Sequence, residues 1–138
     1  MPLGRRVGKD VEGLYEADQR LAGEYRTLLG AANRAERALR DAQAAGVAEP
    51  ELHALTVAFD AALTEALAAA EAAERAEMGP KGYAPADADA KTRRTAEIAR
   101  RKAKARPSVR PWTAEAVRLR TAREAHRLSY RTVPGAML

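Results

Sequence analysis

The chain has 138 residues and no cysteine, which excludes disulfides, thiol nucleophiles and cysteine-ligated zinc. Its net charge of +5 is unevenly divided: residues 1–79 contain 9 Lys/Arg and 14 Asp/Glu, whereas residues 80–138 contain 15 Lys/Arg and 5 Asp/Glu. This division predicts an acidic, alanine-rich packing unit over residues 1–79, followed by a basic arm over residues 80–138 that binds an anionic partner.

Residues 9–45 are predicted to form the first helix, because apolar residues recur at alternating spacings of four and three along five heptads. Asp18 interrupts this apolar seam. Gly23 and Gly30 lie off the seam, where they either only weaken the helix or let another backbone come close. Gly46 then suits the left-handed position that ends a helix.

A second helix is predicted from about Pro50 to Met78, since proline favours the first turn and Gly79 ends the apolar pattern. The short connection makes the two helices antiparallel neighbours, with large side chains of one facing small side chains of the other. One hairpin covers a single stripe on each helix, so we expect it to self-associate or to dock on a larger body. The side chains expected to pack or to anchor a partner are Leu14, Leu21, Tyr25, Leu28, Leu39, Leu52, Leu55, Phe59, Leu63 and Trp112.

The basic arm is predicted to be partly extended and to contain two further helices, near residues 86–106 and 113–130. Thr113 is expected to cap the second of these helices, with Trp112 and Val117 forming a hydrophobic staple. Only 7 of the chain's 22 Leu, Ile, Val and Phe residues lie in the arm. Because so few apolar side chains cannot offset the conformational entropy of folding, we expect a partner to order the arm.

Basic residues dominate residues 91–131, which contain 14 Lys/Arg and 3 Glu. This density suits many phosphate contacts, and it suits an acidic protein surface as well, so both nucleic acid and protein remain open as partners. A membrane is disfavoured because no Phe- or Leu-rich amphipathic face accompanies the charge. The candidate anion contacts are Arg93, Arg94, Arg100, Arg101, Lys102, Lys104, Arg106, Arg120, Arg123, Arg127 and Arg131.

The residue pattern contains no catalytic or metal-binding constellation. His53 and His126 lie in distant segments, and Glu49 precedes His53 by four residues rather than the three of helical di-iron motifs. Residues 79–82 lack the length and the flanking strand of a phosphate-binding loop. We therefore expect no enzymatic activity, no cofactor and no metal site.

The first residues are charged, and no apolar stretch follows them, so a secretory signal peptide is not expected. No run approaches the roughly 20 apolar residues of a membrane-spanning helix. We expect the protein in the cytoplasm or within an assembled particle.

Together these features predict an all-α protein, a long antiparallel helical hairpin followed by the basic arm. The function that fits best is a non-enzymatic structural or adaptor subunit of a larger assembly, such as a phage particle or another nucleoprotein complex. In such a subunit the hairpin packs and the arm docks on an anionic surface. The alternative is a small dimeric DNA-binding accessory or regulatory protein of a plasmid or phage, which holds duplex DNA with the arginine face of residues 113–130.

Overall fold

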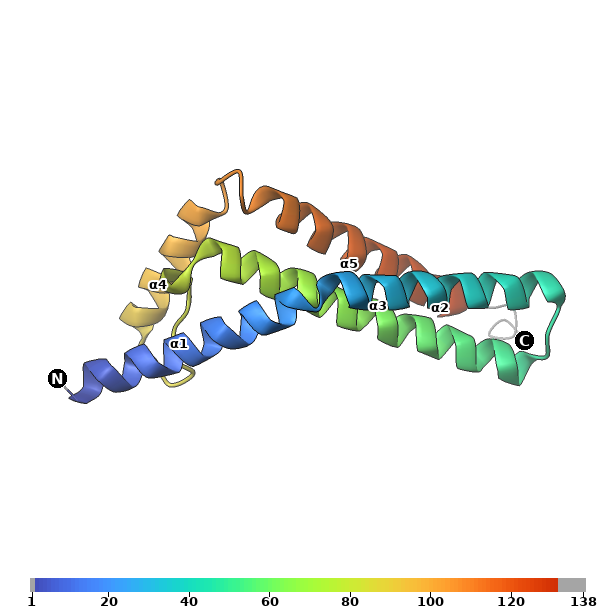
Figure 1. The fold of residues 1–138 in the computed structure, drawn as a ribbon, viewed down its shortest axis with the longest axis horizontal. Coiled ribbons are helices and arrows are strands. Elements are labelled where there is room, and N and C mark those ends of the chain that lie inside the picture. Colours follow the sequence, from blue (N-terminus) through green and yellow to red (C-terminus); the bar gives the residue numbers. More distant parts are fainter. Residues whose placement is uncertain (1, 132–138) are drawn as a thin grey trace.

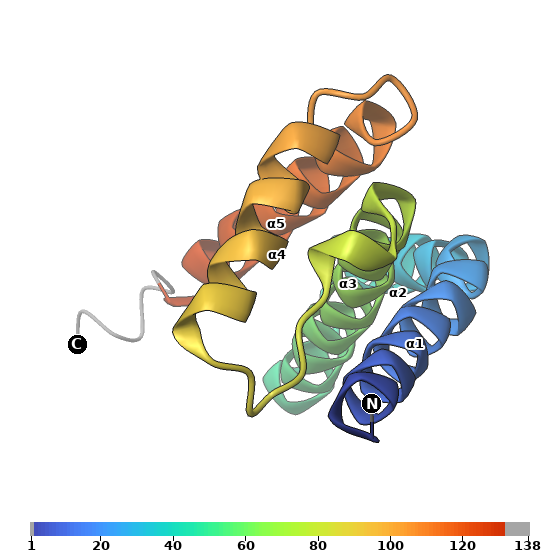
Figure 2. The same cartoon turned by 90° about the vertical axis from the view of Figure 1, so that its left-hand side faces the viewer.

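The computed structural model describes the backbone of residues 2–131 and the side chains of residues 8–130. Within this range the elements are α1 (Pro2–Gly23), α2 (Tyr25–Ala45), α3 (Glu49–Met78), a 3₁₀ turn η1 (Pro80–Gly82), α4 (Ala90–Ala103) and α5 (Arg110–Arg131). The prediction of an all-α fold is confirmed for these residues. The longest helix, α3, packs against α1, α2 and α5, and α4 lies across its C-terminal end (Figure 1, Figure 2).

The predicted helix over residues 9–45 is wrong in two respects. The structure begins it at Pro2 and divides it at Glu24, where the backbone stays in the right-handed helical region but is distorted (φ −90°, ψ −4°), and the amide donates to the Leu21 carbonyl. Gly23 weakens the helix at this point, since it loses more conformational freedom than any other residue on folding. The break lets α1 follow one half of α3 and α2 follow the other (Figure 1).

Among the described residues, no other backbone comes close to Gly23 or Gly30, the two glycines that lie off the seam. A Cβ on Gly23 would meet nothing within 4 Å, and one on Gly30 would meet only the Arg34 side chain of its own helix. Within the described part of the chain, these glycines therefore weaken the helix without admitting a neighbour.

The connection between α2 and α3 follows the sequence expectation. Gly46 adopts the left-handed conformation (φ 69°, ψ 34°), and its amide donates to the carbonyls of Ala42 and Gln43. The amide of Val47 also donates to the Ala42 carbonyl, at 3.2 Å, which completes a Schellman turn. Pro50 lies in the first turn of α3, where a missing amide proton costs nothing. The predicted stop at Gly46 is confirmed.

The core is built from large side chains that pack on alanines. Its buried residues are Tyr25, Ala32 and Leu39 of α2, Phe59, Leu63, Ala66, Leu67, Ala69 and Ala70 of α3, and Ala116 and Leu119 of α5. Of the predicted packing residues, Tyr25, Leu39, Phe59 and Leu63 are buried, and Leu21, Leu28, Leu52, Leu55 and Trp112 pack partly buried against this core. Leu14, by contrast, is 44% exposed.

The expectation that residues 80–138 stay outside the core is wrong for α5. Ala116 and Leu119 are buried against α3, and Val109 is buried with Met78 and Ala103 in a second small cluster. A count of large apolar residues does not reveal this packing, because besides Leu119 and Trp112 the contacts of α5 with the core use small and polar side chains such as Ala116 and His126. Alanine needs no large partner surface when two helices approach closely.

The predicted staple at the start of the last helix is also wrong. Because α5 already begins at Arg110, Thr113 lies inside the helix rather than at its N-cap, and its hydroxyl donates to Glu74 of α3. Val117 is exposed, so it forms no staple with Trp112. The Trp112 ring instead meets Tyr25 edge to face, with centroids 5.2 Å apart.

The helix predicted near residues 86–106 begins later, at Ala90, because the side chain of Asp89 caps it. The Asp89 carboxylate accepts a hydrogen bond of 2.7 Å from the Thr92 amide. This bond lowers the pKa of Asp89, as expected for an anion at a helix N-terminus. Before it, η1 packs so closely on α4 that a Cβ at Gly82 would lie 2.8 Å from the Arg100 Cγ.

Among the described residues, α3 is long and apolar enough, by length and composition alone, to cross a membrane. By this measure α3 qualifies as a candidate membrane span, whereas we expected no such segment from the sequence. The same composition is typical of the central helix of a helical bundle, and α3 packs against three other helices.

Shortening Phe59 tests the core. We expect Phe59→Ala, at a side chain that is 7% exposed, to lower the free energy of unfolding by about 3 kcal/mol, because it leaves a cavity between α2, α3 and α5. The matched control is Val57→Ala, two residues away and 53% exposed, which should change it by less than about 0.5 kcal/mol. Urea unfolding followed by circular dichroism measures both, and equal effects of the two substitutions would contradict this core.

Candidate functional site

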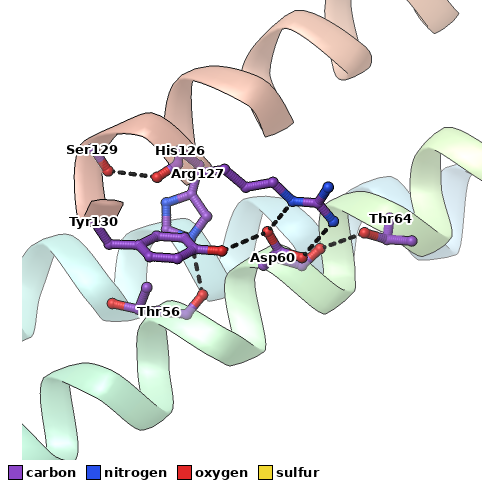
Figure 3. Close-up of polar contacts among 7 residues, drawn as sticks. All are labelled: Thr56, Asp60, Thr64, His126, Arg127, Ser129 and Tyr130. Carbon is purple, nitrogen blue, oxygen red and sulfur yellow. Dashed lines mark hydrogen bonds and ion pairs between the residues drawn. The ribbon is translucent and has the colours of Figure 1, made fainter. Parts of the chain in front are cut away.

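The arginine face of α5 is occupied by acidic residues of α3. Arg127 donates two hydrogen bonds to Asp60, from Nε to Oδ2 at 2.8 Å and from Nη2 to Oδ1 at 3.2 Å (Figure 3). The Tyr130 hydroxyl donates a third bond to the same carboxylate, at 3.3 Å. Paired charges of this kind fix an orientation more than they stabilise a fold, because both groups remain partly solvated.

His126 lies beside this ion pair and is buried. Its Nε2 is 2.9 Å from the Thr56 carbonyl oxygen, which can only accept, so Nε2 carries the proton and donates (Figure 3). The imidazole packs between the rings of Phe59 and Tyr130, with centroids 4.6 and 5.2 Å away. These contacts give His126 a structural role in holding α5 on α3.

Two further polar contacts continue along the same interface. Arg120 donates to Glu71 at 2.8 Å, and Thr113 donates to Glu74. With the Asp60 contact, the partners on α5 run in the opposite order to those on α3, so the helices are antiparallel. The sequence already shows acidic residues on one predicted helix and basic residues on another. It does not show that these two helices lie side by side and pair their charges.

Tyr25 connects α2 to the same helix. Its hydroxyl donates to Glu115 at 2.7 Å, and Glu115 also accepts from Arg118. Burial and the bond to Glu115 raise the pKa of Tyr25 to about 12.

Asp18, the residue that interrupts the apolar seam, joins α1 to the chain that follows α3. It accepts two hydrogen bonds from Arg75, at 2.8 and 3.0 Å, and one from the Tyr83 hydroxyl at 2.6 Å. Burial by itself would raise the pKa of Asp18, but these donors hold it below its ordinary value. The polar residue in the seam thus positions η1 and the start of α4.

On α4 the basic residues are free. Arg93, Arg94, Arg100, Arg101 and Lys102, together with Lys104 just after the helix, are exposed, and none forms an ion pair with the described residues. Arg106 donates to the Met78 carbonyl at 2.9 Å. The α4 helix lies at one end of the molecule (Figure 1), and its exposed basic residues are accessible to solvent there.

The structure therefore separates the predicted anion contacts into two groups. Arg120 and Arg127 are paired with α3, and Arg123 of the same helix is half-buried. Arg131 was also predicted, but the structure describes side chains only for residues 8–130. Among the predicted contacts whose side chains the structure describes, those on and just after α4 are the exposed and unpaired ones.

The described side chains contain no group of three or more His, Asp or Glu placed to hold a metal ion. No protein-family model matches the chain, and neither a curated protein nor a solved structure matches it. The function therefore has to be inferred from this chain's own residues.

The ion pair of Asp60 makes the stability of the fold depend on pH. Because Arg127 lowers the pKa of Asp60 from its ordinary 3.8, the pair stabilises the protein above that pH, and the stabilisation disappears as the pH falls through the lower value. We expect Asp60→Asn to melt at a lower temperature than the wild type at pH 7, and this gap to close as the pH falls through the lowered pKa and Asp60 becomes neutral. Thermal melts at several pH values measure the gap.

The matched control is Asp41→Asn, at an exposed α2 residue that forms no ion pair with the described residues. Its melting temperature should follow that of the wild type at every pH. A gap for Asp60→Asn that stays constant into strong acid would show that the carboxylate does not act through its charge.

Proposed function

We propose that this protein is a non-enzymatic adaptor or structural subunit of a larger assembly, such as a phage particle or another nucleoprotein complex, which docks on nucleic acid through α4. The observation that carries this proposal is the group of exposed, unpaired cations on and just after α4: Arg93, Arg94, Arg100, Arg101, Lys102 and Lys104. Cations that find no acidic partner in their own chain are available to phosphates.

Such a surface binds through charge and does not read sequence. Each phosphate that a lysine or arginine neutralises releases condensed counterions, so affinity falls steeply with salt. Contacts to phosphates position a protein on nucleic acid, whereas base edges specify the sequence. The exposed side chains of α4 are mainly basic, which supports binding that depends on salt and not on sequence.

The second candidate is a DNA-binding regulator that holds duplex with the arginine face of α5. The pairing of Arg120 with Glu71 and of Arg127 with Asp60 argues against it, because DNA would have to displace both carboxylates. This candidate requires α5 to leave α3, whereas binding through α4 requires no rearrangement. The α4 surface is therefore the better supported interface.

Self-association through the hairpin of residues 1–79 is part of the same proposal. Leu14 on α1 remains substantially exposed on the seam side, and a second copy is one partner that would cover it. Sedimentation of the full chain tests this, with Leu14→Glu expected to shift a dimer toward monomer. A wild-type chain that stays monomeric at high concentration would remove self-association from the proposal.

Charge reversal on α4 tests the nucleic-acid interface. We expect Arg93→Glu, Arg94→Glu and Arg101→Glu together to weaken binding to duplex DNA at least about tenfold at 0.1 M salt, roughly equally for all sequences. The slope of log affinity against log salt should become shallower by about 0.9 for each phosphate that the variant no longer neutralises. Titrations at two or more salt concentrations measure both quantities.

The matched control reverses three exposed arginines of α2, namely Arg26, Arg34 and Arg37, and so changes the net charge by the same amount. It should lower DNA affinity much less, because the charges are removed away from the interface. An equal decrease in affinity for the two triple variants would mean that overall charge, and not α4, determines binding. Tight, sequence-selective binding at high salt would contradict the proposal.

A further inference from the structure

A groove lies between η1 and α4, where α3 ends. It encloses about 600 Å³. Its apolar surface comes from Met78, Ile98 and Ala99, and its cations are Lys81, Lys102 and Arg106. Ile98 is 45% exposed, although it is the one large apolar residue of α4. What distinguishes Ile98 from other exposed apolar residues is its place in this groove, where it lies with Met78 and Ala99 among three cations.

The charge of this groove is not balanced within the chain. None of its lining residues is acidic. A second hollow, on the other side of α4, is lined by Glu71, Glu74 and Glu97 as well as by Arg75, Arg100, Arg101 and Lys104. The two sides of the same helix therefore differ: one has carboxylates among its cations, although none of the α4 cations there forms an ion pair with the described residues, and the other has no carboxylate in its lining.

The groove is formed in advance of any partner. Met78 is buried with Ala103 and Val109, which joins the end of α3 to the end of α4 and the start of α5. Arg106 is held at one end of the groove by its bond to the Met78 carbonyl. The wall formed by η1 already lies close against α4, with Gly82 beside the Arg100 side chain, so it cannot move inward and close the groove. A preformed groove loses little conformational freedom on binding.

We infer that this groove binds an acidic amphipathic segment of a partner protein. An apolar side chain of that segment packs on Met78 and Ile98, and its carboxylates pair with Lys81, Lys102 and Arg106. The thioether of methionine adapts to differently shaped apolar side chains, which suits such a contact. Nucleic acid fits less well, since a phosphate backbone offers nothing to cover Ile98.

This inference goes beyond binding to nucleic acid and does not depend on it. It gives the protein a second docking surface of a different kind, which combines apolar burial with charge complementarity. A chain with both surfaces connects an acidic protein to an anionic polymer, as an adaptor does.

The test uses the full chain and three fluorescent synthetic peptides. The probe peptide has leucines at helical spacing among aspartates and glutamates, one control replaces the leucines by serine, and the other replaces the acids by their amides. We expect only the probe to bind, as measured by fluorescence anisotropy. Failure of the probe to bind, or equal binding of either control peptide, overturns the inference.

Variants of the protein separate the groove from general charge. Ile98→Ser keeps every charge and should weaken probe binding about tenfold while leaving duplex DNA binding unchanged. Lys81→Glu with Lys102→Glu should weaken probe binding at least as much, whereas Arg37→Glu on α2 should change it by less than about twofold. Unaltered probe binding by Ile98→Ser would show that the attraction is purely electrostatic and would overturn the groove. If Arg37→Glu lost DNA binding, that result would contradict only the function proposed for α4 and would leave the inference about the groove unaffected.

Discussion

Close approach to the small side chains of α3 is the constraint on which the rest of the structure depends. Ala66, Ala69 and Ala70 have no exposed surface, so Tyr25 and Leu39 of α2 and Leu119 of α5 pack close to the backbone of α3. Because few large residues are available, the core has to be made by short distances between helices rather than by bulky side chains. A larger residue at these alanines would push the helices apart.

The same closeness explains why polar contacts hold α5 in place. Once α5 lies against α3, Asp60 and Glu71 come within hydrogen-bonding distance of Arg127 and Arg120. Each pair is partly solvated and contributes little by itself, yet together with His126 they specify one register of α5 on α3. The basic helix is therefore positioned by acidic residues of its own chain.

This internal pairing divides the basic part of the chain by role. The arginines that face α3 hold the fold, whereas those on α4 have no acidic partner and support the proposed docking on an anionic surface. The hydrogen bonds that Arg75 and Tyr83 donate to Asp18 contribute to this division, because they position the segment that leads into α4. The position of α4 at the end of the molecule (Figure 1) thus depends on these hydrogen bonds as well as on its own contacts with η1 and with Met78.

Local features of the sequence determined the helical class, the turn at Gly46 and the end of α3 at Gly79, because glycine adopts the positive φ angles found at both helix ends without steric cost. The uneven division of charge between residues 1–79 and 80–138 was likewise evident from the sequence, because it requires only a count of the charged residues. Only the tertiary structure decided that the helix bends at Glu24, that Asp18 pairs with Arg75, and that Arg120 and Arg127 pair with carboxylates of α3. These features depend on which helices lie side by side. A free arginine and a paired one have the same sequence signature, so the distinction between α4 and α5 required their positions in space.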